Sequence, residues 1–69
     1  MPVINITSGP MTIEQKKDLI RKLTEVSMSV TGTPEHGTSV LITELPLDSM
    51  GIGKRPASEV MAERQEKNA

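Results

Sequence analysis

The sequence contains no cysteine, phenylalanine, tyrosine or tryptophan, and these absences exclude several kinds of protein. Without cysteine, neither disulfides nor a thiolate metal site can stabilise so small a chain. The chain also has 8 Lys and Arg against 9 Asp and Glu, so it offers neither a basic face for phosphates nor aromatic rings on which bases stack. We therefore expect no nucleic-acid partner and no metal site.

Long apolar runs are also missing. The longest apolar stretch is only a few residues, and the start of the chain lacks a basic segment followed by an apolar one. We therefore expect no membrane span, no secretory peptide and a soluble, cytoplasmic protein. Of the 69 residues, 16 are Leu, Ile or Val, which predicts one small domain, residues 1–69, with a weak core. Oligomerisation is the remaining source of stability.

Two segments have the composition and alternation of β-strands. Residues 2–7 are rich in β-branched side chains and end at a Ser-Gly-Pro cluster. Residues 38–45 place Val40 and Ile42 on one face and Leu41 on the other. The sequence therefore predicts two strands, one at the start of the chain and one beyond its middle.

Between these strands lies the pattern of one helix of about five turns. Thr12 and Gln15 have the spacing of a capping box, and Gly32 is a natural stop. The apolar positions recur at helical spacing: Ile13, Leu19, Ile20, Leu23, Val26 and Val30. The order strand, helix, strand predicts a right-handed β-α-β unit whose strands are parallel.

This unit leaves part of its surface uncovered. One helix covers only one face of a two-stranded sheet, so we expect the other face to pack against another subunit. Glycines within 48–56 predict a turn or short hairpin that can pair with a neighbouring chain. Residues 57–67 predict a short helix, and 61–69 are expected to be a fraying tail. The predicted fold class is α/β, a single β-α-β unit with a short C-terminal hairpin and helix, in an oligomer.

Few residues are suited to catalysis. His36, the single histidine, lies in the loop predicted at 33–37, where it is either a solvated residue or a contact for proton transfer. Gly51 and Gly53 lack the third glycine and the helix start of a phosphate-binding loop, so they predict a turn.

Pro2 stands out because it directly follows Met1 at the start of a strand. Removal of Met1 would leave a free secondary amine, whose ordinary pKa is about 7.7 to 8.0. Burial or nearby cations lower the pKa of such an amine and make it a general base near neutral pH. If Met1 stays, the nitrogen is an amide without a basic lone pair. The alternative interpretation is that Pro2 merely begins an edge strand.

Several short motifs follow one another in a distinctive order and spacing. They are Met1-Pro2, the turn from Gly9 to Thr12 before Glu14-Gln15-Lys16, Leu19-Ile20-Arg21, Ile42-Thr43-Glu44, and Gly51-Ile52-Gly53 followed by Ala57-Ser58. Together they make the sequence resemble the 4-oxalocrotonate tautomerase family over about residues 2–60. The resemblance implies a tautomerase-like β-α-β subunit, commonly in a hexamer of three dimers. It also implies an amino-terminal proline that moves a proton within the enol of a 2-oxo acid.

The sequence departs from that family where the family binds its substrate. Met11, or Pro10 if the gap is placed differently, stands where the family has an arginine before the helix cap. Ser39 matches a second family arginine, and Met50 replaces an aromatic residue before Gly-Ile-Gly. Serine and methionine cannot bind a carboxylate bidentately as arginine does. Dicarboxylate muconates are therefore not expected substrates.

Other residues near these positions can replace the lost contacts. Lys54 and Arg55 lie beside the glycine turn and are either substitute cations or solvated turn residues. Ser39 can donate a neutral hydrogen bond to a carbonyl oxygen or be only a surface residue. Met50, with Met11, can form an apolar wall. The expected site has Pro2 as general base and acid, with Ser39, Met50 and Arg55 binding substrate and with no metal or organic cofactor.

The sequence thus predicts an isomerase that moves the enol proton of a small 2-hydroxy-alkenoate or arylenolpyruvate. The expected partners are this substrate and further copies of the chain, with a hexamer favoured. One alternative is a noncatalytic homologue, or one chain of a hetero-oligomer whose partner supplies the arginines. Another is a different proline-dependent reaction, hydration or decarboxylation of a related unsaturated acid.

Overall fold

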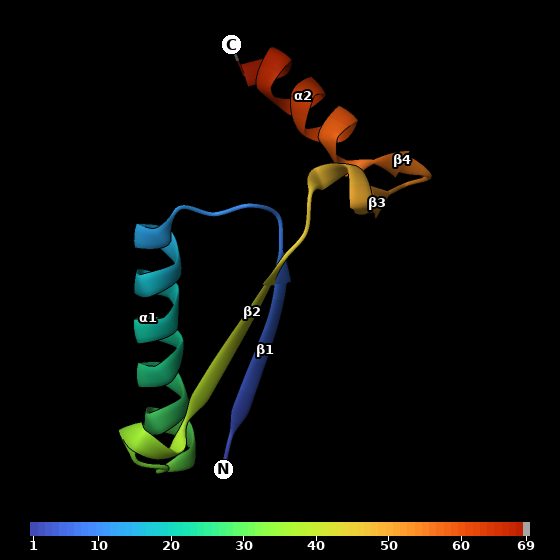
Figure 1. Cartoon of the computed structure of the whole chain (residues 1–69). Helices are drawn as coiled ribbons and strands as arrows, with labels where there is room; N and C mark the ends of the chain where they lie inside the picture. The colour runs from blue at the N-terminus through green and yellow to red at the C-terminus, as the bar shows by residue number, and fades with distance from the viewer. Residues whose placement is uncertain (69) are drawn as a thin grey trace.

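The computed structural model describes the backbone of residues 1–68 and the side chains of residues 1–65. Its elements are β1 (Val3–Ser8), α1 (Ile13–Thr31), η1 (Glu35–Gly37), β2 (Ser39–Glu44), η2 (Leu47–Ser49), β3 (Gly51–Ile52), β4 (Arg55–Pro56) and α2 (Ala57–Asn68). Figure 1 shows α1 lying along the β1-β2 sheet, with the β3-β4 hairpin and α2 beyond the carboxyl ends of the two strands. This confirms the predicted α/β class, a β-α-β unit followed by a hairpin and a helix. Of the tail at 61–69 that was expected to fray, residues 61–68 belong to α2, and residue 69 lies outside the described residues.

The sheet is a parallel pair. Its register runs from Val3 opposite Ser39 to Ser8 opposite Glu44. One further hydrogen bond extends each end: the Ser39 N–H donates to the Pro2 carbonyl (3.1 Å), and the Leu45 N–H donates to the Ser8 carbonyl (2.9 Å). Each end of each strand lies within one residue of the end that the sequence predicts. Parallel pairing therefore places both strand starts at one end of the sheet and both strand ends at the other.

The alternation of side chains distinguishes the two faces of the sheet. Ile4, Ile6, Val40 and Ile42 are half-buried, whereas Val3 and Leu41, on the other face, are 55% and 53% exposed. Strand residues at alternate positions share a face, so the half-buried set is the face that α1 covers. The opposite face is open in the single chain, as the sequence predicts.

Both ends of α1 are capped as expected. The Thr12 hydroxyl accepts the Gln15 N–H (3.1 Å), and the Gln15 side chain accepts the Thr12 N–H (2.9 Å). Gly32 adopts a left-handed φ of 74° and donates its N–H to the Met28 carbonyl (3.0 Å). The capping box satisfies two backbone donors that no helical carbonyl can reach.

The apolar stripe of α1 is wider than the surface that covers the sheet. Leu19 and Leu23 are half-buried, but Ile13 and Val26 are exposed, and Val30 is 81% exposed. The predicted helical periodicity is correct, yet only part of it packs within one chain. The remainder is apolar surface without a partner in the described chain.

The chain has almost no interior of its own. Among the described residues, Ala57 is the one apolar residue that is fully buried, at 1% exposure. The radius of gyration is 15.5 Å, whereas a compact domain of this length has about 11 Å. The accessible surface is 5290 Å², against about 4,200 Å² for a compact monomer of this mass. The subunit therefore exposes about 1,000 Å² more than a compact monomer does.

The arm formed by η2, the hairpin and α2 approaches the sheet closely at Gly9. A Cβ atom on Gly9 would lie 2.8 Å from Cδ2 of Leu47, so Leu47 occupies the space that a side chain there would need. Within the arm, the Ser58 hydroxyl donates to the Asp48 carboxylate, which ties α2 to η2. None of the described helices combines the length and apolar character needed to cross a membrane.

Glu44 joins the end of β2 to the loop before α1. Its carboxylate accepts the Lys16 ammonium (2.5 Å) and the Met11 N–H (3.0 Å). These two donors favour the ionised form and hold the pKa of the Glu44 carboxyl below its ordinary value.

We predict that Thr12→Ala lowers the free energy of unfolding by about 1 kcal/mol, because the Gln15 N–H loses its acceptor. Urea denaturation followed by circular dichroism at fixed protein concentration measures the change. Thr12→Ser keeps the oxygen and is the matched control. Equal losses in the two variants would contradict a capping role.

We also predict an acid dependence that passes through Glu44. Because the folded pKa is lowered, the unfolded chain takes up the proton first, and stability is lost as the pH falls through the folded pKa. Between about pH 6 and about pH 3, wild type should therefore lose more unfolding free energy than Glu44→Gln. Urea denaturation across this range is the measurement, with Glu35→Gln as the control for loss of a carboxylate. Parallel slopes for Glu44→Gln and wild type would contradict the prediction.

Candidate functional site

Pro2 lies at the amino end of β1, half-buried, and its carbonyl accepts the Ser39 N–H at 3.1 Å. In the described chain its nitrogen is in a peptide bond with Met1, which is 90% exposed. The Met1–Pro2 peptide bond therefore lies at the surface, and the half-buried Pro2 ring lies at the edge of the sheet face that α1 covers. Loss of Met1 would expose a secondary amine at this boundary between apolar side chains and solvent.

Ser39 is close to Pro2 along the backbone, but the two side chains lie on different faces. The register pairs Ser39 with Val3, so these two side chains share the open face of the sheet. Pro2 precedes Val3 and therefore shares the α1 side with Ile4. Within one chain, the Ser39 hydroxyl cannot lie beside the Pro2 ring. It lies on the open face of the sheet.

Met50 and Met11 lie at the other end of the sheet from Pro2. Met11 follows the carboxyl end of β1, where its N–H is bound by Glu44. Met50 is half-buried in the arm, where its carbonyl accepts the Ala57 N–H (2.7 Å) and its own N–H donates to the Leu47 carbonyl (3.3 Å). Figure 1 shows the hairpin beyond the end of the sheet opposite to the N-terminus. The structure therefore does not bring either methionine to Pro2 within one chain.

The β3-β4 hairpin closes through a two-residue turn. Gly51 pairs with Pro56 and Ile52 with Arg55. The two residues between them, Gly53 and Lys54, have left-handed φ values of 57° and 72°. Positive φ at both positions is the mark of a type I′ turn, which matches the twist of paired strands. For lysine this conformation costs roughly 1–2 kcal/mol.

Arg55 is held within the arm by two carboxylates. Its two terminal nitrogens donate to the two oxygens of Glu63 at 2.9 and 2.7 Å, and its Nε lies 3.6 Å from Oε2 of Glu59. The guanidinium lowers the pKa of Glu63, and Glu63 raises the pKa of Arg55. Analysis of the sequence missed this pair, although Arg55, Glu59 and Glu63 follow one another at spacings of four.

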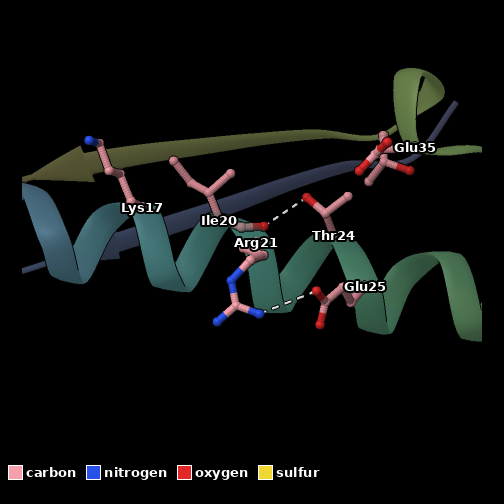
Figure 2. A pocket seen from close by; sticks show the side chains of 7 residues that line it. Lys17, Ile20, Arg21, Thr24, Glu25 and Glu35 are labelled. Carbon is pink, nitrogen blue, oxygen red and sulfur yellow. Dashed lines mark hydrogen bonds and ion pairs between the residues drawn. The ribbon is translucent and has the colours of Figure 1, made fainter.

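A groove of about 400 Å³ lies between α1 and η1 (Figure 2). Its lining residues are Lys17, Ile20, Arg21, Thr24, Glu25, Glu35 and Thr38. Figure 2 shows Arg21 bound to Glu25 (3.3 Å) and the Thr24 hydroxyl donating to the Ile20 carbonyl (2.7 Å). The groove includes neither Pro2 nor any part of the hairpin, so it is not the predicted proton-transfer pocket.

His36 is an exposed residue of η1, the turn that leads into β2. It lies at the same end of the sheet as Pro2, because Ser39 binds the Pro2 carbonyl. Within the described part of the chain, no three His, Cys, Asp or Glu side chains gather into a group that could hold a metal ion.

Comparison with known proteins identifies relatives that share both sequence and fold. Residues 2–59 match the family model described as "Tautomerase enzyme". The 2-hydroxymuconate tautomerase of Pseudomonas sp. (strain CF600) is 45% identical over 49 residues, which are 71% of this chain and 78% of that protein.

Solved structures lead to the same family. TomN, a 4-oxalocrotonate tautomerase homologue in the tomaymycin biosynthetic pathway, matches with a TM-score of 0.83 and 26% identity, over 88% of this chain and 95% of TomN. The heterohexamer 4-oxalocrotonate tautomerase from Chloroflexus aurantiacus J-10-fl matches in fold with a TM-score of 0.81 and 24% identity, over 87% and 98% of the two chains.

The match extends from Pro2, at the amino end of β1, through the hairpin and into the first turn of α2. It therefore includes every element that carries a predicted site residue. The chain belongs to the tautomerase family and is an isomerase of the 4-oxalocrotonate tautomerase type.

Proposed function

We propose that the protein catalyses keto-enol proton transfer on a small 2-hydroxy-alkenoate or arylenolpyruvate, with Pro2 as the base once Met1 is removed. The observation that supports this most directly is the place of Pro2 in a chain of this family. Pro2 is half-buried and directly precedes β1, at the end of a peptide bond that is itself at the surface.

The proposed reaction is a single proton shuttled between two atoms of the substrate. The Pro2 nitrogen takes the proton of the enol hydroxyl, and the negative charge spreads over the conjugated oxygen and carbon atoms. The protonated nitrogen then gives the same proton to carbon, and the enol becomes a ketone. Because the base and the acid are one group of the chain, the proposal needs neither a metal nor an organic cofactor.

The remaining contacts in the proposed site come from neighbouring copies of the chain. Pro2 lies at one end of the sheet, and Met11, Met50 and the hairpin lie at the other (Figure 1). The excess surface of about 1,000 Å² is more than one partner loses in an interface of standard size, about 800 Å². A homo-oligomer, with a hexamer favoured, would cover this surface and bring a neighbour's hairpin to each Pro2.

In this arrangement the side chains missing from one chain have distinct roles. Ser39, on the open face, would donate a hydrogen bond to a carbonyl oxygen in a neighbour's pocket. Met11 and Met50 would exclude water from the Pro2 amine, and desolvation lowers the pKa of an amine toward neutrality. A hairpin cation, Lys54 or Arg55, would bind the substrate's carboxylate.

We predict that Pro2→Ala lowers kcat/KM by at least about 100-fold, because it replaces the positioned secondary amine that transfers the proton. The assay is ketonisation of phenylenolpyruvate followed in the ultraviolet, on protein whose intact mass shows that Met1 is absent. Pro34→Ala, a change in the loop before η1, is the matched control and should retain activity. Equal turnover by Pro2→Ala and wild type would contradict the assignment.

A second candidate function follows from the missing arginines. Without a cation at Met11 or Ser39, this chain could be one subunit of a hetero-oligomer whose partner supplies it, and a protein of the same fold is a heterohexamer. This hypothesis predicts that the processed chain alone has no turnover and that a second polypeptide accompanies it on native purification.

The other alternative is a different proline-dependent reaction of a related unsaturated acid. Nuclear magnetic resonance of the product separates tautomerisation from hydration or decarboxylation.

A further inference from the structure

The tip of the β3-β4 hairpin carries two adjacent cations in different environments. Lys54 is exposed, sits in the turn at φ 72°, and forms no ion pair with any side chain that the structure describes. Arg55 belongs to β4 and forms ion pairs with two carboxylates of α2. The two cations therefore differ in whether they can bind a substrate.

Arg55 is not available without breaking its own contacts. Both terminal nitrogens of the guanidinium already face the two oxygens of Glu63, the geometry in which arginine binds a carboxylate best. To bind a substrate's carboxylate in the same way, Arg55 would first have to release Glu63. Its present contacts instead tie β4 to the second turn of α2.

This contact fixes the position of the turn beside it. A two-stranded hairpin is at best marginally stable by itself. Here the first residue of β4, Arg55, is held by Glu63. Just beyond the end of β4, the Ala57 N–H donates to the Met50 carbonyl (2.7 Å). Lys54 directly precedes Arg55, so the Arg55–Glu63 pair orients the lysine as well as the strand.

The turn itself favours a residue other than lysine. Glycine, asparagine and aspartate are the residues that a type I′ turn prefers at positive φ. Lysine at φ 72° therefore carries a backbone strain that glycine or asparagine at the same position would relieve. Strain of this kind points to a role for the side chain.

We propose that Lys54 binds the carboxylate of the substrate at the Pro2 of a neighbouring subunit, and that Arg55, through Glu63, is a positioning residue. The proposal rests on the proposed function, since it concerns the same site. Contact within one chain is ruled out by the fold, because the hairpin and Pro2 lie at opposite ends of the sheet (Figure 1).

The first test removes the cation in two ways. Lys54→Met keeps most of the side chain's volume, and Lys54→Gly suits the left-handed turn, so misfolding cannot explain a defect shared by both. Both should raise KM for phenylenolpyruvate by about 10- to 100-fold and change kcat much less. Lys54→Arg should keep KM near the wild-type value, and Lys22→Met, which removes a cation from α1, should leave it unchanged.

The methyl ester of phenylenolpyruvate separates carboxylate binding from other effects. It keeps the enol and lacks the negative charge, so Lys54→Met should leave its KM unchanged. An unchanged KM for the acid in both Lys54 variants, while turnover still depends on Pro2, would overturn this inference and leave the proposed function standing. Absence of Pro2-dependent turnover in the wild type would overturn both.

The second test asks whether Arg55 acts through Lys54. Glu63→Gln breaks the paired hydrogen bonds and should raise KM for the acid several-fold. In the double variant Lys54→Met/Glu63→Gln, KM should be no higher than in Lys54→Met alone, because a positioning residue has no effect once the positioned group is gone. Additive effects would overturn the positioning role.

The third test establishes that the contact is between subunits. Pro2→Ala and Lys54→Met chains, co-expressed and purified as mixed oligomers, contain sites in which a native Pro2 meets a native Lys54. With random mixing, about a quarter of the sites are of this kind, since each group comes from a different chain. At low substrate concentration, kcat/KM of the mixed oligomers should exceed the mean of the two separate variants. A value equal to that mean would overturn the arrangement in trans.

Discussion

Parallel pairing of β1 and β2 is the constraint from which the rest of the molecule follows. Two parallel strands need a long crossover, and α1 supplies it while covering one face of the sheet. The same pairing puts Pro2 and the start of β2 at one end and sends the chain out into the arm at the other. Everything that the arm carries is thereby separated from Pro2 of the same chain. In the proposed site, whatever the arm contributes to Pro2 would therefore come from a second chain, and the reason is topology rather than any particular side chain.

The energetics lead in the same direction. A subunit in which Ala57 is the one fully buried apolar residue among those described has little hydrophobic free energy to offset the entropy of ordering its chain. Local interactions contribute instead: the capping box of α1, the contacts of Glu44, and the Arg55–Glu63 pair. Each stabilises one segment, and none replaces a core. In the proposed oligomer, folding and assembly would be linked, since the surface buried between subunits would supply what the interior lacks.

Much of the fold could be predicted because its signals are local. β-Branched composition predicted β1, alternation predicted β2, the Thr12 capping box predicted the start of α1, and Gly32 predicted its end. The exposure of Val30 could not be predicted, since helical spacing shows which residues share a stripe but not how much of that stripe a short sheet can cover.

The candidate site was harder to predict than the fold. Sequence motifs led to Pro2, but the separation of the Ser39 hydroxyl from the Pro2 ring depends on strand register, which joins residues far apart in the chain. The place of Arg55 beside a glycine turn favoured a role in binding the substrate. The structure instead shows it bound to Glu63, eight residues further on, a contact that depends on how α2 leaves the hairpin.

Leu47 lies against Gly9 at the point where the arm meets the sheet. Leu47 packs where any side chain on residue 9 would lie, and the arm extends from that point along a molecule 43 Å in its longest dimension. The arm therefore meets the sheet at a residue that has no Cβ atom. A methyl group at residue 9 would collide with Cδ2 of Leu47, so the Leu47 side chain would have to leave this position. Residue 9 therefore has to stay without a side chain for the arm to keep this contact with the sheet.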